Sequence, residues 1–127
     1  MPTLAAEKLE GFVAEIARAG GSSDQEAGKI GHQLVGANLR GHDSHGIGMM
    51  PAYVNALQFG KLKPNQHVSV VRDDGAILQL DGNAGYGQVI GEESMEKGIA
   101  VAKAQGLCLM HPWGEGLLSV REQFVRP

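Results

Sequence analysis

Residues 68–80 read VSVVRDDGAILQL and decide the fold class of this chain. Two runs of β-prone residues, Val68–Val71 and Ala76–Leu80, flank the polar segment Arg72–Gly75. An Asp-Gly pair between such runs is a strong hairpin signal, because glycine accepts the left-handed backbone of a tight turn. The stretch therefore predicts two short strands joined by a turn.

The segments after this hairpin indicate an α/β region. A glycine-rich loop, Gly82–Gln88, leads to a helix expected over about Glu92–Gln105, and Gly106 is expected to end it. The inward side chains of this helix are expected to be Met95, Ile99 and Ala102. Leu107–Met110 then has the pattern of a buried strand.

The residues before the hairpin predict helices. The first is expected to begin with Thr3 as its N-cap and to end at Gly20-Gly21, and Ser23–Glu26 has the pattern of a capping box that opens a second. A short third helix is expected from Pro51. The apolar faces of the first two helices are expected to be Leu9, Phe12, Val13 and Ile16, and then Ala27, Ile30, Leu34 and Val35.

Together these elements predict an α/β protein in three parts. Residues 1–60 form a helical N-terminal part, residues 61–110 begin an α/β part, and residues 111–127 form a tail of different character. The α/β part has few strands, so it is expected to be the front of a larger domain.

Composition narrows the class of protein. The 127 residues carry a net charge of −3 and no basic stripe, so a nucleic-acid partner is not expected. The single cysteine, Cys108, cannot form an internal disulfide, which fits a reducing compartment. Neither a signal peptide nor a membrane span is expected. We therefore expect a cytoplasmic protein.

The segment Arg40–Gly46 concentrates reactive groups, placing His42, Asp43, Ser44 and His45 between two glycines. Three interpretations stay open. His45 could be a proton donor to a substrate oxygen, with Ser44 orienting it. His42, Asp43 and His45 could instead bind a metal, although adjacent residues of a turn rarely converge on one ion. All four could also be ordinary turn residues.

The glycine-rich loop precedes a helix, where backbone N–H groups can bind phosphate. Its spacing, Gly-x-x-Gly-x-Gly, is the reverse of the dinucleotide fingerprint, which favours a connecting loop.

These motifs, taken in order, are similar to a known family. The chain resembles the N-terminal region of the malate/L-lactate dehydrogenases, a family that includes ureidoglycolate and sulfolactate dehydrogenases. The resemblance runs from about Leu4 to Met110 and is carried by Gly41–Ile47, Pro51-x-Tyr53-Val54, Gly60, Pro64, the segment Leu80–Gln88 and Lys103–Gly106.

The resemblance implies that residues 61–110 begin a mixed-sheet cofactor domain that is not a Rossmann fold, and that residues 111–127 are a divergent tail. It also implies an NAD- or NADP-dependent oxidoreductase that interconverts a 2-hydroxy acid and a 2-oxo acid, as a homodimer. Ser44 and His45 match the family's catalytic pair, with His45 as proton donor, and Tyr53 matches a position near the substrate. No cofactor-binding residue is assigned by it, and no metal is implied.

Two departures from the family pattern affect what is expected. Met49 stands where the family often has an arginine five residues after the serine, so the substrate carboxylate must be bound elsewhere. The family's later Asn-x-x-His motif is absent, and His111 does not match it. The expectation is a truncated form with an incomplete nicotinamide site. The alternatives are an inactive fragment that associates with a partner chain and a small metal-dependent hydrolase.

Overall fold

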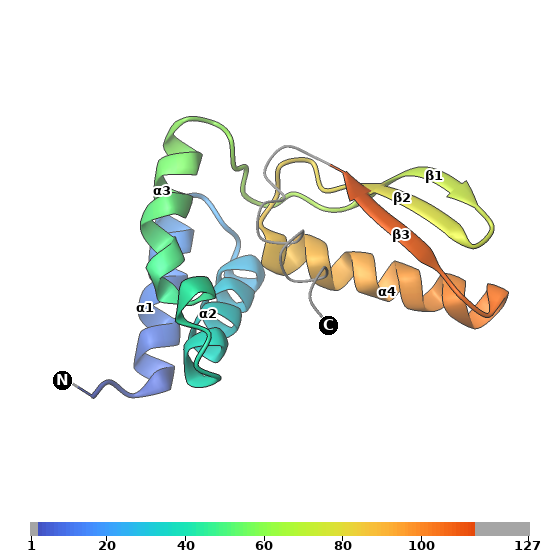
Figure 1. The fold of residues 1–127 in the computed structure, drawn as a ribbon. Coiled ribbons are helices and arrows are strands. Elements are labelled where there is room, and N and C mark those ends of the chain that lie inside the picture. Colours follow the sequence, from blue (N-terminus) through green and yellow to red (C-terminus); the bar gives the residue numbers. More distant parts are fainter. Residues whose placement is uncertain (1–2, 114–127) are drawn as a thin grey trace. The chain divides into compact units, whose positions relative to one another are not determined.

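A computed structural model describes residues 3–113 of the chain. It divides into two compact units, residues 1–65 and residues 66–127. Figure 1 labels their elements in chain order: three α-helices in the first unit, then a hairpin, a long helix and a last strand in the second. A helical part followed by a small sheet confirms the expected fold class.

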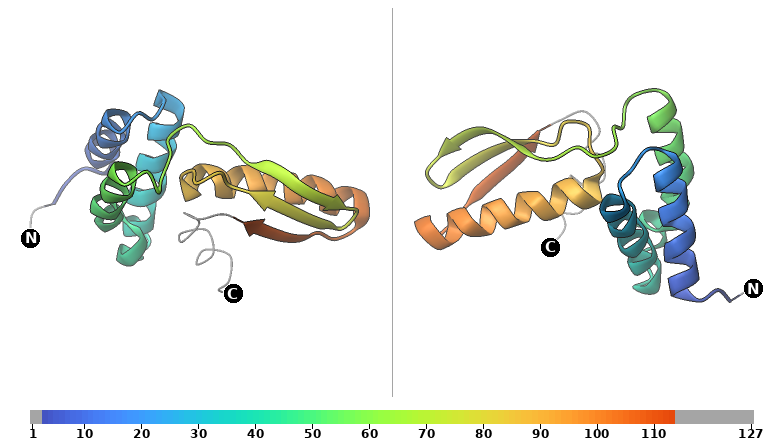
Figure 2. Two further views of the ribbon diagram at one scale, coloured as in Figure 1. Left: turned by 90° about the horizontal axis from the view of Figure 1, so that it is seen from above. Right: turned by 180° about the vertical axis from the view of Figure 1, so that it is seen from behind.

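The core of the first unit lies between two antiparallel helices, α1 (Ala6–Ala19) and α2 (Asp24–Leu39), which lie side by side in Figures 1 and 2. The buried side chains of these two helices include Val13, Ala14, Ala17, Ala27, Ile30, Leu34 and Val35. The face predicted for α2 is confirmed. For α1 the prediction was wrong at Phe12, which is 60% exposed, because the helix buries the neighbouring face that holds Val13, Ala14 and Ala17.

The ends of these helices differ partly from expectation. Helix α1 begins at Ala6 after Ala5 and has no side-chain cap, so the prediction of Thr3 as N-cap was wrong. It ends at Gly20, as predicted. Ser23 caps α2 by accepting a hydrogen bond from the Glu26 N–H. The short helix α3 (Met50–Gln58) has proline in its first turn.

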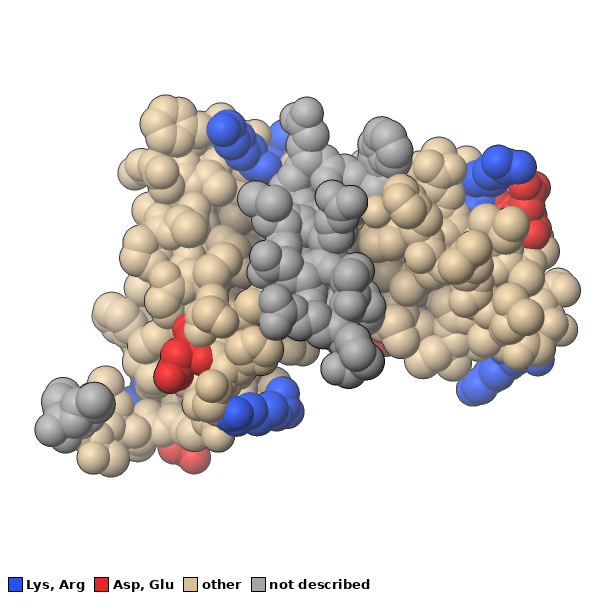
Figure 3. Space-filling view, in the orientation of Figure 1, with Lys and Arg blue, Asp and Glu red and all other residues tan. Residues whose placement is uncertain are grey.

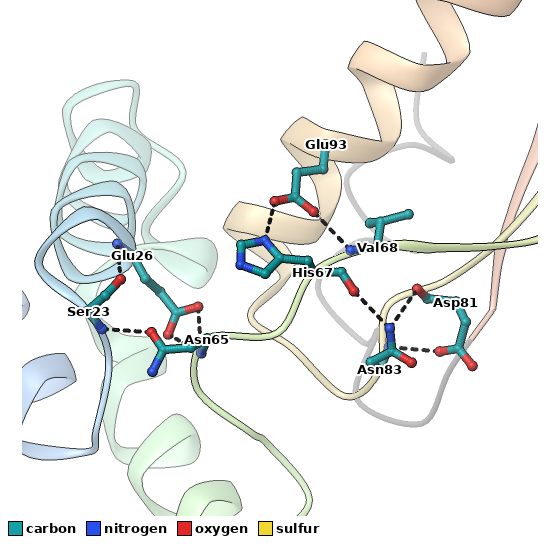
Figure 4. A network of polar contacts seen from close by, with 8 residues as sticks. All are labelled: Ser23, Glu26, Asn65, His67, Val68, Asp81, Asn83 and Glu93. Atoms are coloured by element: carbon teal, nitrogen blue, oxygen red, sulfur yellow. Dashed lines mark hydrogen bonds and ion pairs between the residues drawn. The ribbon is translucent and has the colours of Figure 1, made fainter.

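Glu26 does not complete the predicted capping box, because its carboxylate is used elsewhere. It is 5% exposed and accepts hydrogen bonds from Asn65 N at 2.9 and 3.0 Å and from Ser22 Oγ at 2.6 Å. The Ser23 N–H donates to Asn65 Oδ1 at 2.8 Å instead (Figure 4). Asn65, at φ +57°, thus ties the end of the first unit to the start of α2.

The second unit is a mixed sheet with one helix along it. Strand β1 (Ser69–Asp74) pairs antiparallel with β2 (Ile77–Asp81), and β2 pairs parallel with β3 (Leu109–Trp113). The hairpin is confirmed, although Arg72, Asp73 and Asp74 belong to the strand and the turn begins at Gly75. The two views of Figure 2 show helix α4 (Gly87–Gln105) along one face of this sheet.

Helix α4 differs from the prediction in its start and its buried face. It begins at Gly87, so Val89 and Ile90 are buried on the helix rather than in a loop. Met95 and Ile99 are 39% and 47% exposed, so the predicted inward face was wrong at these two positions, while Ala102 is half-buried. Gly91, Ser94 and Gly98 are buried instead, because small residues let the helix approach the sheet closely. A Cβ at Gly98 would lie 3.3 Å from Met110 Sδ.

The strand predicted at Leu107–Met110 is displaced and less buried than expected. It spans Leu109–Trp113, and Leu107 and Leu109 are 62% and 64% exposed. The expected tail, 111–127, falls outside the described residues from Gly114 on.

Charge and hydropathy add two observations. On the face shown in Figure 3, the Lys and Arg side chains form separate small groups within each unit and no continuous stripe. Across residues 3–113, no helix is long and apolar enough to span a membrane.

Candidate functional site

The candidate site lies at the end of α2, where the backbone is tightly determined. Gly41 takes a left-handed conformation with φ +76°. Its N–H donates to Asn38 O at 2.9 Å, and the N–H of His42 donates to Ala37 O at 2.9 Å. This is the Schellman pattern that ends a helix at glycine. The reactive segment therefore starts from a well-defined helix end.

Two short 3-10 turns then carry the chain from α2 to α3. The first, Asp43–His45, contains the predicted pair Ser44 and His45, and the second is Ile47–Met49. Backbone hydrogen bonds close both turns, from His45 N to His42 O at 3.0 Å and from Met49 N to Gly46 O at 3.0 Å. Met49, in place of the arginine, lies half-buried in the second turn.

The two residues predicted to act together are in contact. Ser44 Oγ lies 2.9 Å from Nδ1 of His45, within hydrogen-bond distance. The hydrogen bond can be donated by either group, depending on the imidazole tautomer. When Ser44 donates, neutral His45 keeps its proton on Nε2 and presents a donor there. Ser44 is exposed and His45 is half-buried, so the pair lies at the surface of this unit.

His42 and Asp43 take other roles than the metal interpretation requires. The ring of His42 meets the ring of His45 edge to face, with centroids 4.6 Å apart. Asp43 Oδ1 accepts a hydrogen bond from Asn38 Nδ2 at 2.6 Å. Within residues 3–113, no three His, Cys, Asp or Glu side chains are placed to hold a metal ion. The geometry gives the metal interpretation no support.

Asn38 is a member of this site that sequence analysis missed. Its Nδ2 donates to Asp43, and its Oδ1 accepts from the Ile47 N–H at 2.9 Å. An asparagine in the last turn of a helix, three residues before a helix-ending glycine, was the available signal, because asparagine favours local hydrogen bonds over helix interiors. The third predicted residue, Tyr53, lies half-buried on α3.

The loop between β2 and α4 does not fit a phosphate. The Asn83 N–H donates to Asp81 Oδ1 at 2.7 Å, and the Gly85 N–H donates to Gly82 O at 2.9 Å. These donors are used inside the loop, beside a carboxylate that repels phosphate. A Cβ at Gly85 would lie 2.9 Å from Gln66 Cβ, so this glycine serves close packing of the loop. The geometry fits a connecting loop.

The polar contacts around this loop hold the unit together (Figure 4). Asn83 Nδ2 donates to His67 O at 2.8 Å, and His67 Nδ1 lies 2.6 Å from Glu93 Oε1. The second oxygen of Glu93 accepts from the Val68 N–H at 2.9 Å. A shallow depression elsewhere, at the hairpin and the end of α4, is lined by Asp73 and otherwise uncharged residues. Within the described residues, neither the β2–α4 loop nor this depression suits the phosphates of a dinucleotide, because each contains an aspartate.

The model of the malate/L-lactate dehydrogenase family matches residues 4–111 of this chain.

The chain belongs to the malate/L-lactate dehydrogenase family.

Curated relatives agree with this assignment. Hydroxycarboxylate dehydrogenase B from Escherichia coli K12 is 43% identical over 102 residues, which cover 80% of this chain and 28% of the relative. L-sulfolactate dehydrogenase from Methanocaldococcus jannaschii is 33% identical over 101 residues, 80% of this chain and 29% of the relative. The chain thus spans less than a third of the length of these two relatives.

Solved structures of the family have the same fold. The malate dehydrogenase of Pyrococcus horikoshii OT3 is similar with a TM-score of 0.79 and 27% identity, over 91% of this chain and 34% of that one. The sulfolactate dehydrogenase of M. jannaschii gives 0.73 and 33% identity, over 79% of this chain and 29% of that one. Family membership, and a fold other than the Rossmann fold, are therefore confirmed.

Proposed function

We propose that this chain carries the proton-transfer site of an NAD- or NADP-dependent oxidoreductase that interconverts a 2-hydroxy acid and a 2-oxo acid. The observation that supports the proposal most is the contact of Ser44 with His45 at hydrogen-bond distance. The pair lies on a turn that is held by backbone hydrogen bonds from His45 N to His42 O and from Gly46 N to Asp43 O. Two of the relatives above are named for the dehydrogenation of sulfolactate and of hydroxycarboxylates. A homodimer and a cytoplasmic location belong to the same proposal.

In this proposal the pair handles the proton on the substrate oxygen. Reduction of a 2-oxo acid develops negative charge on the carbonyl oxygen, and the imidazolium form of His45 donates from Nε2 the proton that neutralises it. This leaves a neutral imidazole whose remaining proton, on Nδ1, is donated to Ser44 Oγ. Ser44 holds Nδ1 of the imidazole and thereby fixes which nitrogen faces the substrate. In the opposite direction His45 accepts the hydroxyl proton. Tyr53 is proposed to lie near the substrate.

We further propose that the 127 residues alone do not complete the nicotinamide site. Support comes from the loop before α4, in which the N–H groups of Asn83 and Gly85 donate within the loop, and from the short span of the chain relative to the relatives above. Titrating the purified chain with NADH and following nicotinamide fluorescence tests this directly. We expect no saturable binding and no oxidation with pyruvate or oxaloacetate. Saturable binding followed by oxidation would overturn this part of the proposal.

The role of His45 is tested in a chimera. Residues 1–110 are joined to the segment of E. coli hydroxycarboxylate dehydrogenase B that follows the matched region. We expect turnover of NADH or NADPH with a 2-oxo acid, and a loss in kcat of about 10²–10⁴-fold for His45→Ala with unchanged cofactor affinity. The control is Gln33→Ala, on an exposed position of α2. Comparable turnover by the His45→Ala chimera would exclude His45 as the proton donor.

A second candidate function is an inactive chain that associates with a partner. It is favoured by the exposed apolar residues of the second unit, which include Val71 at 58% and Leu109 at 64% exposure. Exposed apolar strands bind other chains readily. A chain that neither binds NADH nor gains turnover in the chimera, but forms a defined complex, would have this function.

A further inference from the structure

We infer that Asn38 is a positioning residue for His45, acting as a clamp on the turn that carries Ser44 and His45. The inference rests on the proposed function in one respect, namely that His45 is the group whose orientation matters. Asn38 itself belongs to α2 and needs no contact with substrate for this role.

The side-chain amide of Asn38 joins the two ends of the turn. Nδ2 donates to Asp43 Oδ1 at 2.6 Å, at the first residue of the turn. Oδ1 accepts from the Ile47 N–H at 2.9 Å, at the residue after Gly46. The three residues Ser44, His45 and Gly46 lie between these two attachment points. One rigid amide therefore holds both ends of the segment at a fixed separation.

The packing of Gly46 supports the same role. Gly46 is buried, and a Cβ built on it would overlap Oδ1 and Cγ of Asn38. Its φ of −89° does not require glycine, so the need for glycine here is one of space. The amide of Asn38 thus lies directly against the turn backbone. The glycine after the histidine is explained by the clamp rather than by backbone strain.

The backbone of Asn38 fixes the helix end as well. Its carbonyl accepts from the Gly41 N–H at 2.9 Å in the helix-ending motif. Asn38 is half-buried, and of its two side-chain hydrogen bonds the one from the Ile47 N–H is partly shielded from water, while the one to Asp43 is exposed. One residue, Asn38, therefore forms hydrogen bonds to both the helix end and the turn. Small errors in the placement of a catalytic group cost large factors in rate, which gives such a clamp functional value.

The test uses the 127-residue chain and a spectroscopic readout. The rings of His42 and His45 are close enough for a proton cross-relaxation peak in NMR, and the ¹⁵N shifts of His45 report its tautomer. For Asn38→Ala we expect loss of the inter-ring peak and averaging of the His45 tautomers. Gln33→Ala, also on α2, is expected to keep both signals.

A charge exchange provides the rescue. Asn38→Asp alone should disrupt the turn, because it places two carboxylates together at the contact with Asp43. The double variant Asn38→Asp with Asp43→Asn restores one donor and one acceptor, and the carboxylate introduced on α2 can still accept from the Ile47 N–H. We expect the inter-ring peak to return in the double variant. Such a return distinguishes a specific amide clamp from a general effect on folding.

Three NMR results would contradict the clamp. The inference is overturned if wild type lacks the inter-ring peak, if Asn38→Ala keeps wild-type signals, or if Asn38→Ala unfolds and the double variant fails to recover the peak. These results do not depend on turnover. Failure of the chimera with an intact NMR result would remove the proposed function and leave the clamp. Turnover with unchanged NMR signals in Asn38→Ala would remove the clamp alone.

Discussion

Short polar side chains form hydrogen bonds that fix the two ends of α2 in the first unit. Ser23 caps α2, Asn38 holds the turn after it, and Asn65 binds the start of α2 from the far end of the unit. Each uses a side chain that can both reach and orient backbone groups nearby. Glu26 differs, because it is a buried carboxylate whose acceptors are filled by Asn65 N and Ser22 Oγ.

Glu26→Gln is expected to destabilise the chain. The Asn65 N–H donates to both carboxylate oxygens, so the amide NH₂ of glutamine would face a donor. Loss of a buried hydrogen bond to a charged group lowers the free energy of unfolding by about 1–3 kcal/mol. Urea unfolding followed by far-UV circular dichroism measures the change. The matched control is Glu15→Gln, the same substitution at an exposed position of α1, expected within about 0.5 kcal/mol of wild type. Equal effects at both positions would contradict the role given to Glu26.

At the level of elements, close helix packing depends on residues without side chains. Gly31 is buried on α2 where a Cβ would lie 2.6 Å from the Glu10 carbonyl oxygen of α1. Gly28, one turn earlier on the same helix, has no atom within 4 Å of the same position. Helix propensity treats these glycines alike, because it does not depend on what faces the residue. Their difference is purely one of packing between α1 and α2.

The pair gives opposite predictions for one substitution. Gly28→Ala is expected to stabilise the chain by about 0.5–1 kcal/mol, because alanine loses less backbone entropy in a helix. Gly31→Ala is expected to destabilise it by about 1–3 kcal/mol, because the backbone of α1 must move. Thermal unfolding of the two variants beside wild type measures the signs. A stabilising Gly31→Ala would show that the two helices lie farther apart than described.

At the scale of the whole molecule, the notable feature is the small sheet of the second unit, whose apolar strand residues are only partly buried. Helix α4 lies along one face, while Val70, Val71 and Ile77 are about half exposed and Leu109 more so. Exposed apolar residues on strands promote contact with other chains. This property follows from the described strands and does not depend on the catalytic proposal.

We therefore expect concentration-dependent association of the purified chain, measured by sedimentation velocity. Val71→Lys and Leu109→Lys should each weaken it, because a charge on an exposed strand opposes pairing. Leu39→Lys replaces a leucine that is 71% exposed in the first unit and serves as the control. It should leave association unchanged. Equal weakening by the control would mean that the strands are not the associating surface.

The sequence alone determined the features that depend on local order along the chain. These are the helix-capping Ser23, the glycine end of α1, the hairpin at Asp74-Gly75, and the neighbouring pair Ser44 and His45 with the family resemblance that contains it. Each is set by neighbouring residues, through turn chemistry and hydrogen bonds that span a few positions.

Only the tertiary structure decided which partners meet across long separations. Glu26 binds Asn65 rather than its own helix start, Gly91 and Gly98 rather than Met95 and Ile99 face inward on α4, and Leu109 stays exposed on β3. The reason is that burial and hydrogen-bond pairing depend on which surface approaches a residue, which periodicity does not encode. Asn38 became part of the site for the same reason, once Gly46 and Ile47 had folded back against it.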